Sequence, residues 1–105
     1  MLLILTTVPD LACGETLAEG LVEKKLAACV QILPQMTSVY FWDGAVQKDS
    51  EHLLLIKTGD DVFESVCQFL SENHPYSIPE IVAIDSEKVS EPYNQWLNGY
   101  LKSKV

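Results

Sequence analysis

The chain has 105 residues, of which 48% are hydrophobic and 21% charged. This composition fits one globular domain, residues 1–105, and excludes a disordered or fibrous protein. Seven lysines and no arginine face fifteen acidic residues, which gives a net charge of −8. Nucleic acids and anionic membranes both attract basic surfaces, so we expect neither as a partner.

The compartment is predicted from what the sequence lacks. No stretch approaches the ~20 apolar residues of a membrane span, and the apolar residues 1–8 have neither the charged flank nor the cleavage site of a signal peptide. The cysteines are odd in number and far apart: Cys13, Cys29 and Cys67. These features favour free thiols in a reducing cytoplasm.

The first third of the chain predicts a strand, a helix and a second strand. Leu2–Val8 is a short apolar run that ends at Pro9, which is typical of a buried central strand. Asp10 can cap the helix that follows, where leucines recur at helical spacing over residues 11–27. Cys29–Ile32 then returns to strand character.

A central hairpin is expected from two alternating runs, Ser38–Trp42 and His52–Lys57. Its tip has two candidate positions. Asp43-Gly44 is the stronger local turn signal, but it would leave the polar run Gln47–His52 inside a strand. A tip near Lys48-Asp49-Ser50 places that run in solvent. We prefer the second tip, with Asp43-Gly44 as a bulge.

The second half of the chain predicts a helix and a strand. Asp61 followed by Glu64 has the pattern of a capping box, and apolar residues at helical spacing continue to about Asn73. His74-Pro75 would stop this helix. Ile81–Asp85 has the apolar character of one more strand.

The order of elements predicts the fold. Pro92 opens a last short helix, on which Trp96 is expected to pack. The order β-α-β-β-α-β plus a terminal helix fits an α+β ferredoxin-like sandwich with helices on one face of the sheet. The long hairpin would expose strand edges, and the aromatic residues Tyr40, Phe41 and Trp42 on it favour pairing with another subunit. We therefore expect an oligomer.

One candidate metal site lies before the last predicted strand. His74 is a good ligand type for copper or zinc, and Glu80 is a fair one. Their spacing is not a recognised chelate pattern. The structural alternative is that His74 and the proline after it end the helix, that Tyr76 packs, and that Glu80 pairs with Lys57.

Other chemistry-bearing residues have two interpretations each. Tyr40 and Trp42 share one face of a strand, either as core or interface, or as one wall of a small-molecule pocket with Lys57 as an anion anchor. Cys29 is a small buried hydrophobe or a ligand. Cys13 lies where the first helix begins, a position that lowers a thiol pKa. No nucleophile–base pair is visible, so we expect a protein that is not an enzyme.

Six blocks of sequence, which follow one another along nearly the whole chain, form a distinctive set. They are Thr6–Asp10, Val22–Val30, Ser38–Gly44, Ile56–Thr58, His74–Ile81 and Tyr93–Leu97. The motifs Leu-Ala-Ala-Cys-Val and His-Pro-Tyr-x-x-Pro-Glu within them are the most specific. Together these blocks resemble the CutA family of divalent-ion tolerance proteins.

The resemblance implies a homotrimer similar to PII signalling proteins, with a role in tolerance of copper and other divalent cations. It also implies a copper site made of His74, Glu80 and a cysteine near the end of the first strand. Thr6 stands at that cysteine's position, and a hydroxyl is a poor ligand for Cu(I). We therefore expect a weak Cu(II) or Zn(II) site, with no cofactor required.

A second hypothesis is a PII-like trimeric small-molecule sensor or an interaction scaffold. Its ligand would bind in clefts between subunits. The expected cleft residues are Cys29, Tyr40, Trp42, Lys57 and Tyr76.

Overall fold

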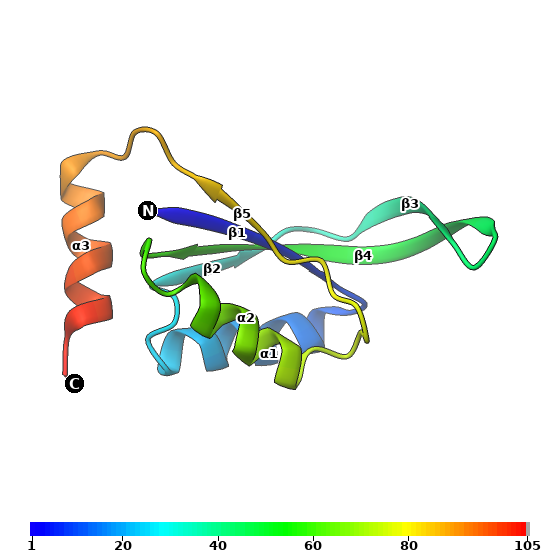
Figure 1. Cartoon of the computed structure of the whole chain (residues 1–105), viewed down its shortest axis with the longest axis horizontal. Coiled ribbons are helices and arrows are strands. Elements are labelled where there is room, and N and C mark those ends of the chain that lie inside the picture. Colours follow the sequence, from blue (N-terminus) through cyan, green and yellow to red (C-terminus); the bar gives the residue numbers. More distant parts are fainter. Residues whose placement is uncertain (105) are drawn as a thin grey trace.

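A computed structural model describes residues 1–104 and contains one antiparallel sheet of five strands with two helices on one face (Figure 1). The elements are β1 (Leu2–Val8), α1 (Leu11–Glu23), β2 (Cys29–Ile32), β3 (Met36–Trp42), β4 (Ala45–Thr58), α2 (Phe63–Asn73), β5 (Val82–Asp85) and α3 (Glu91–Lys102). This order is the ferredoxin-like α+β fold with a C-terminal helix that the sequence predicts. No helix among residues 1–104 is long and apolar enough to cross a membrane.

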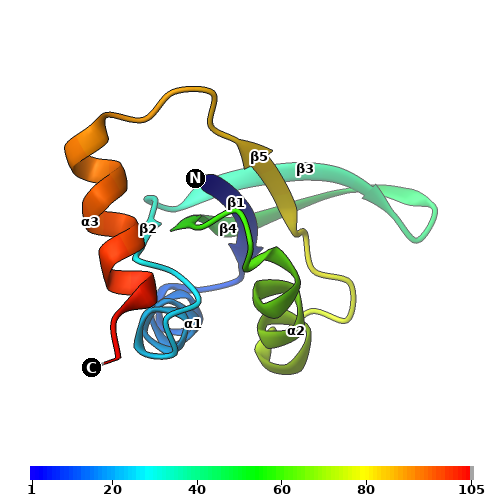
Figure 2. The same cartoon turned by 60° about the vertical axis from the view of Figure 1, so that its left-hand side comes forward.

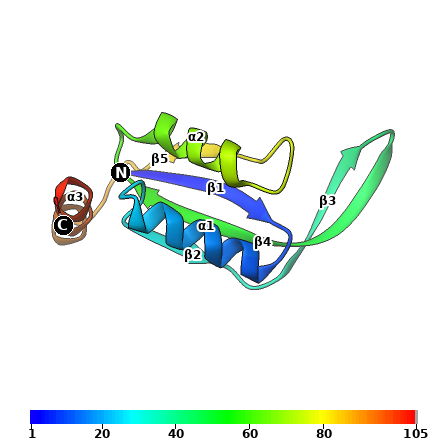
Figure 3. The same ribbon diagram turned by 90° about the horizontal axis from the view of Figure 1, so that it is seen from below.

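The 14-residue strand β4 organises the sheet. Its second half lies between β1 and β2, and β1 in turn pairs with β5, so the strand order is β2-β4-β1-β5. Its first half pairs only with β3. The β3–β4 hairpin therefore projects beyond the helices, and the molecule extends 45 Å along one axis but 26 and 23 Å along the others (Figures 1 and 3).

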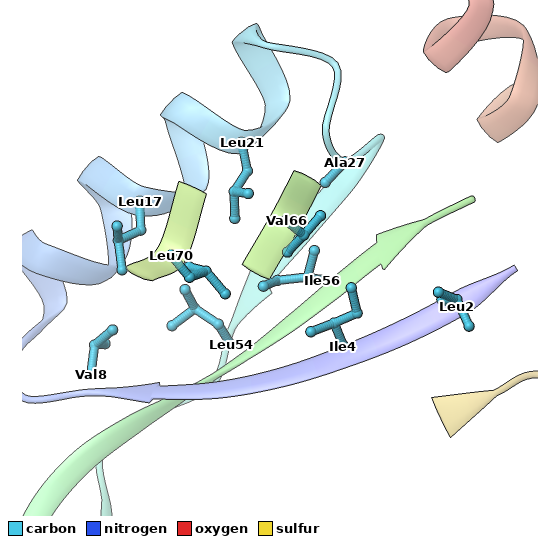
Figure 4. Close-up of a cluster of buried hydrophobic side chains, with 10 residues drawn as sticks. All are labelled: Leu2, Ile4, Val8, Leu17, Leu21, Ala27, Leu54, Ile56, Val66 and Leu70. Carbon is cyan, nitrogen blue, oxygen red and sulfur yellow. The ribbon is translucent and has the colours of Figure 1, made fainter. Parts of the chain in front are cut away.

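The core lies between the sheet and the pair of helices. Alternate residues of β1 and β4 point toward α1 and α2, and Ile4, Leu54 and Ile56 are fully buried there. Leu21 of α1 and Val66 of α2 reach the same cluster from the other side (Figure 4). The buried residues that alternate along the strands therefore pack in one apolar layer with those that recur at helical spacing on the helices.

The start of α1 is as predicted, but its end is earlier. The Asp10 side chain accepts a hydrogen bond from the backbone N–H of Cys13 at 2.8 Å, which is an N-cap. The helix ends at Glu23 and not near residue 27. Lys25 adopts a left-handed backbone conformation with φ of 57°, which cannot continue a right-handed helix.

The start of α2 differs from the prediction and its end agrees with it. The N-cap is Val62, which has no side-chain capping bond, so the predicted capping box at Asp61 is wrong. At the other end, the backbone N–H of His74 donates to the Leu70 carbonyl at 2.8 Å and the next residues turn away. The proline after His74 ends the helix, as expected.

The hairpin tip is Asp43-Gly44, so the preferred tip at residues 48–50 is wrong. Asp43 and Gly44 have φ of 53° and 77°, the left-handed conformations that two-residue hairpin turns require. The polar run that follows remains in β4 and pairs with β3, for example Lys48 with Val39. Because this part of the hairpin lies outside the body of the protein, polar side chains there need no apolar face.

The C-terminal helix α3 lies beside one end of the sheet, at the opposite end from the hairpin (Figures 1 and 2). Leu97 is its fully buried residue, and the Tyr100 hydroxyl donates to the carbonyl of Val22 in α1 at 2.6 Å. Trp96 packs in part, because its ring centroid lies 5.5 Å from that of Tyr93 while 52% of the residue is exposed. Only part of the surface of α3 therefore packs against the other described residues.

Candidate functional site

One face of the sheet is covered by neither α1 nor α2, and we call it the open face. On β1 and β4 it carries half-buried leucines that alternate with the core residues. Leu3 pairs with Ile84 and Leu5 with Val82 across the β1–β5 ladder, so these β5 residues lie on the same face. Ile84 and Val82 are each 48% exposed.

A groove of about 810 Å³ lies at the hairpin end of the open face. Leu5 and Leu53 form an apolar part of its lining. Tyr40 and Trp42 of β3 also line it, and so do residues 75–78 and Glu80 of the segment that connects α2 to β5. Its volume is within the range of small-molecule sites.

The charged groups that line the groove are acidic. Asp49, Glu51 and Glu80 line it, and no lysine or histidine does so among the described residues. The hydroxyl of Tyr40 donates to the Asp49 carboxylate, and that of Tyr76 donates to Oε2 of Glu51 at 2.7 Å. Glu51 is only 8% exposed. Each tyrosine ring is therefore held at the groove by a carboxylate.

The electrostatic surroundings keep both phenols protonated. The hydrogen bond to Asp49 raises the pKa of Tyr40. Burial, and then the hydrogen bond to Glu51, raise the pKa of Tyr76 further above its ordinary value. Both hydroxyls remain hydrogen-bond donors at neutral pH.

His74 lies at the end of β1 with both ring nitrogens hydrogen-bonded. Nε2 is 2.9 Å from the Thr7 carbonyl oxygen and 3.3 Å from the Thr6 hydroxyl, and Nδ1 accepts from the backbone N–H of Tyr76 at 3.1 Å. This pattern assigns the proton to Nε2 of a neutral ring. Burial lowers the pKa of His74, against smaller opposite effects of the Thr7 carbonyl and Glu51.

These bonds give His74 a structural role at a strand edge. β5 pairs with β1 only as far as Leu5, so the Thr7 carbonyl lies beyond the ladder and the imidazole satisfies it. A metal ion on either nitrogen would have to displace one hydrogen bond. Glu80 lines the groove and His74 does not. The described residues contain no group of three or more metal-ligating side chains, and the His74–Glu80 site stays a prediction.

The five expected cleft residues fall into two places. Tyr40, Trp42 and Tyr76 lie together in the groove. Cys29 and Lys57 pair across β2 and β4 at the far end of the sheet and are absent from the groove lining. An anion anchor at this groove would therefore have to come from elsewhere than Lys57 of the same chain.

Lys57 also lacks the ion pair expected of it. Its Nζ lies 5.8 Å from the centroid of the Tyr93 ring, a cation–π distance. An ion pair with Glu80 is not formed within residues 1–104. The helix α3 thus supplies the partner of this lysine.

Cys13 differs from the expectation for a thiol at a helix start. Burial, followed by the negative charge of Asp10, raises the pKa of the Cys13 thiol. The capping carboxylate that begins the helix lies beside the thiol and opposes its ionisation. This cysteine has no activated character.

Sequence reasoning missed Asp49 and Glu51 as groove residues. It placed both in a solvated hairpin tip. A signal was present, because Glu51, Leu53 and Leu55 alternate along one strand and must share a face. The polar residues 47–52 suggest a turn when they are considered without this alternation.

Comparisons with known proteins agree along almost the whole chain. The family model "CutA1 divalent ion tolerance protein" matches residues 2–100. The divalent-cation tolerance protein CutA of Thermus thermophilus is 44% identical over 94 residues, covering 90% of this chain and 91% of the relative. The chloroplastic protein CutA of Arabidopsis thaliana is 43% identical over 91% of this chain. The chain spans 53% of that plant protein, about half its length.

Solved structures share the fold. A variant of CutA1 from Pyrococcus horikoshii OT3 superposes with a TM-score of 0.94 at 31% identity, covering 98% of this chain and 100% of the other. The periplasmic divalent cation tolerance protein CutA from Archaeoglobus fulgidus gives a TM-score of 0.93 at 32% identity, covering 97% and 100%. These matches include the projecting hairpin and the C-terminal helix.

Proposed function

Since the chain belongs to the CutA family of divalent-ion tolerance proteins, which are not enzymes, we propose that it acts as a homotrimer that binds divalent cations. The observation that carries the trimer is the open face, where Ile84 and Val82 remain 48% exposed beside half-buried leucines. Contiguous exposed apolar surface of this kind marks an interface.

The hairpin supports the same assembly. On its face opposite the groove, Phe41 pairs with Val46, and these side chains are 71% and 68% exposed. A long hairpin with free edges and apolar ends needs a covering partner. A second and a third copy supply that cover in a closed ring, which also explains why the hairpin extends so far beyond its own core.

The metal site we propose is weak and holds Cu(II) or Zn(II) through His74 and Glu80. The lowered pKa of His74 favours binding, because a metal ion takes the neutral imidazole. Two features oppose it: one hydrogen bond of the ring must be displaced, and the neighbour at 3.3 Å is the Thr6 hydroxyl and not a thiolate. A hydroxyl adds little affinity for a soft cation.

Native mass spectrometry of the chelator-treated protein, with and without stoichiometric Cu(II) or Zn(II), tests both parts. We expect a trimer that takes up about one metal per chain. His74→Gln should lower the metal affinity more than tenfold, whereas the control His52→Gln should leave it within twofold. A monomer would overturn the assembly, and an unchanged affinity in His74→Gln would overturn the metal site.

The compartment we propose is the cytoplasm. The support is the odd number of cysteines, none of which is disulfide-bonded. Relatives are named chloroplastic and periplasmic, so the family occurs in several compartments.

A second candidate function is a trimeric small-molecule sensor. The groove favours it, because its volume of about 810 Å³ and its aromatic side chains suit an organic ligand better than a bare ion. Titration of the protein with a panel of metabolites, followed by the fluorescence of Trp42, tests this function. No change in fluorescence with any metabolite would exclude it.

A further inference from the structure

We propose that the groove on the open face binds a small organic cation, an ammonium or guanidinium group attached to an apolar body. The inference rests on the second candidate function and names its ligand class. It shares Glu80 with the proposed metal site but not His74, which does not line the groove.

The charge of the groove selects a cation. Asp49, Glu51 and Glu80 line it with no lysine or histidine beside them among the described residues. Glu51 is over nine-tenths buried, and Tyr76 holds its Oε2. Its Oε1 accepts no hydrogen bond from residues 1–104 and is accessible to solvent. A carboxylate oxygen that is still open in this way is a strong acceptor for an N–H donor.

The aromatic side chains suit the same ligand. Tyr40, Trp42 and Tyr76 come from two separate segments and line one cavity. The carboxylates fix both tyrosine rings through their hydroxyls, so the rings are held in place before a ligand arrives. Aromatic faces attract ammonium and guanidinium groups, most strongly where water is excluded.

The shape of the groove argues against a bare metal ion. A metal ion needs several ligands within about 2–2.6 Å, and the described residues contain no such group. The cavity is far larger than one ion, and Leu5, Leu53 and Ile78 make much of its lining apolar. A ligand with a charged group on an apolar body would place its charge beside the carboxylates and its body against these apolar side chains.

The probe for this proposal is phenethylammonium, with 3-phenylpropanoate as a control of similar size and opposite charge. The Trp96→Phe variant leaves Trp42 as the only tryptophan, so its fluorescence reports the groove. We expect a saturable change with phenethylammonium and at least tenfold weaker binding of 3-phenylpropanoate. No saturable change, or equal binding of the two, would overturn the proposal.

Matched variants locate the charge that matters. Glu51→Gln can still accept the Tyr76 hydrogen bond, so it removes charge with little change in shape, and Glu80→Gln does the same at an exposed position. Each should weaken phenethylammonium binding at least fivefold. The control Glu87→Gln makes the same charge change on an exposed residue outside the groove and should stay within twofold. An equal loss in all three would mean non-specific attraction and overturn the site.

Native masses of the same samples separate this proposal from the assembly. If the wild type is a trimer and phenethylammonium does not bind, the ligand class fails and the trimer stands. If the chain is a monomer that still binds phenethylammonium with the expected variant effects, the assembly fails and the groove stands. If Glu51→Gln dissociates the trimer while the probe has no effect, the groove is filled by a second copy and the proposal is wrong.

Discussion

The two faces of β4 carry nearly the same side chains in opposite surroundings. Leu54 and Ile56 point to the helices and have no exposed surface, whereas Leu53 and Leu55 on the open face remain half-buried. Propensity and hydrophobicity cannot separate adjacent leucines on one strand. The difference lies in what covers them, since α1 and α2 cover one face and no element within residues 1–104 covers the whole of the other.

The two faces of the sheet therefore have different roles. The closed face holds the fold together, and its side chains can be understood from packing alone. The open face carries the apolar surface proposed for assembly and the acidic groove. The segment that begins at His74 contributes to both roles. The buried His74 ring hydrogen-bonds to the edge of β1, and the residues that follow it line the groove.

The largest expected effect compares identical truncations on the two faces. Leu54→Ala should lower the free energy of unfolding by about 2–5 kcal/mol, because it leaves a cavity in the core. Leu55→Ala should lower the free energy of unfolding of the fold by about 1 kcal/mol or less but weaken the proposed trimer. Urea unfolding at several protein concentrations measures both. Equal losses with the same concentration dependence would erase the distinction between the faces.

The second prediction concerns the proposed metal site. Thr6→Cys should raise Cu(I) affinity at least tenfold, because it places a thiol beside the imidazole where the hydroxyl is now 3.3 Å away. Competition with a chromophoric Cu(I) chelator measures the change. Thr58→Cys is the control, since Thr58 is equally buried but bonds to the Leu26 carbonyl. Equal gains in the two variants would mean that the added thiol binds without His74.

The third prediction tests the corrected hairpin tip. Gly44→Ala should destabilise the protein by about 1 kcal/mol, because alanine is strained at a φ of 77°. The added methyl group meets no atom within 4 Å, so crowding does not contribute. Gly99→Ala, also without neighbours but in α3 at an ordinary φ, should be neutral or stabilising. A neutral Gly44→Ala would place the turn elsewhere.

The smallest expected effect is a pH dependence of stability from His74. Burial lowers its pKa in the folded state below the ordinary value of about 6.5, so the unfolded chain binds more protons in that range. Its stability contribution is complete above about pH 6.5 and decreases as pH falls toward the folded-state pKa. Unfolding free energies between pH 7.5 and 5.5 should therefore fall less in His74→Gln than in the wild type. A difference of the opposite sign would mean that the folded protein favours charged His74.

Local patterns predicted the elements that lie in the core. Leu2–Val8 was expected at the bounds it has, because a strand between two others must be apolar along its length. The errors lie in segments whose structure is not determined by packing in the core. The hairpin tip was misplaced because polar residues 47–50 suggested a turn, although a strand outside the core tolerates them.

The groove was only partly predictable. Tyr40 and Trp42 were recognised as one face of a strand, and Tyr76 as part of a distinctive block. Their meeting depends on how residues 75–80 pass the end of β1, which no local pattern specifies. The pairing of Tyr76 with Glu51 joins residues 25 positions apart and required the structure.

The most direct test of the division between the faces is the mass of the protein in solution by sedimentation equilibrium. We predict three times the chain mass for the wild type and for Ser71→Lys, a charge added on an exposed residue of α2. Ile84→Lys, which adds the same charge to the open face, should sediment as a folded monomer. A monomeric wild type, or a trimer that persists in Ile84→Lys, would contradict the account.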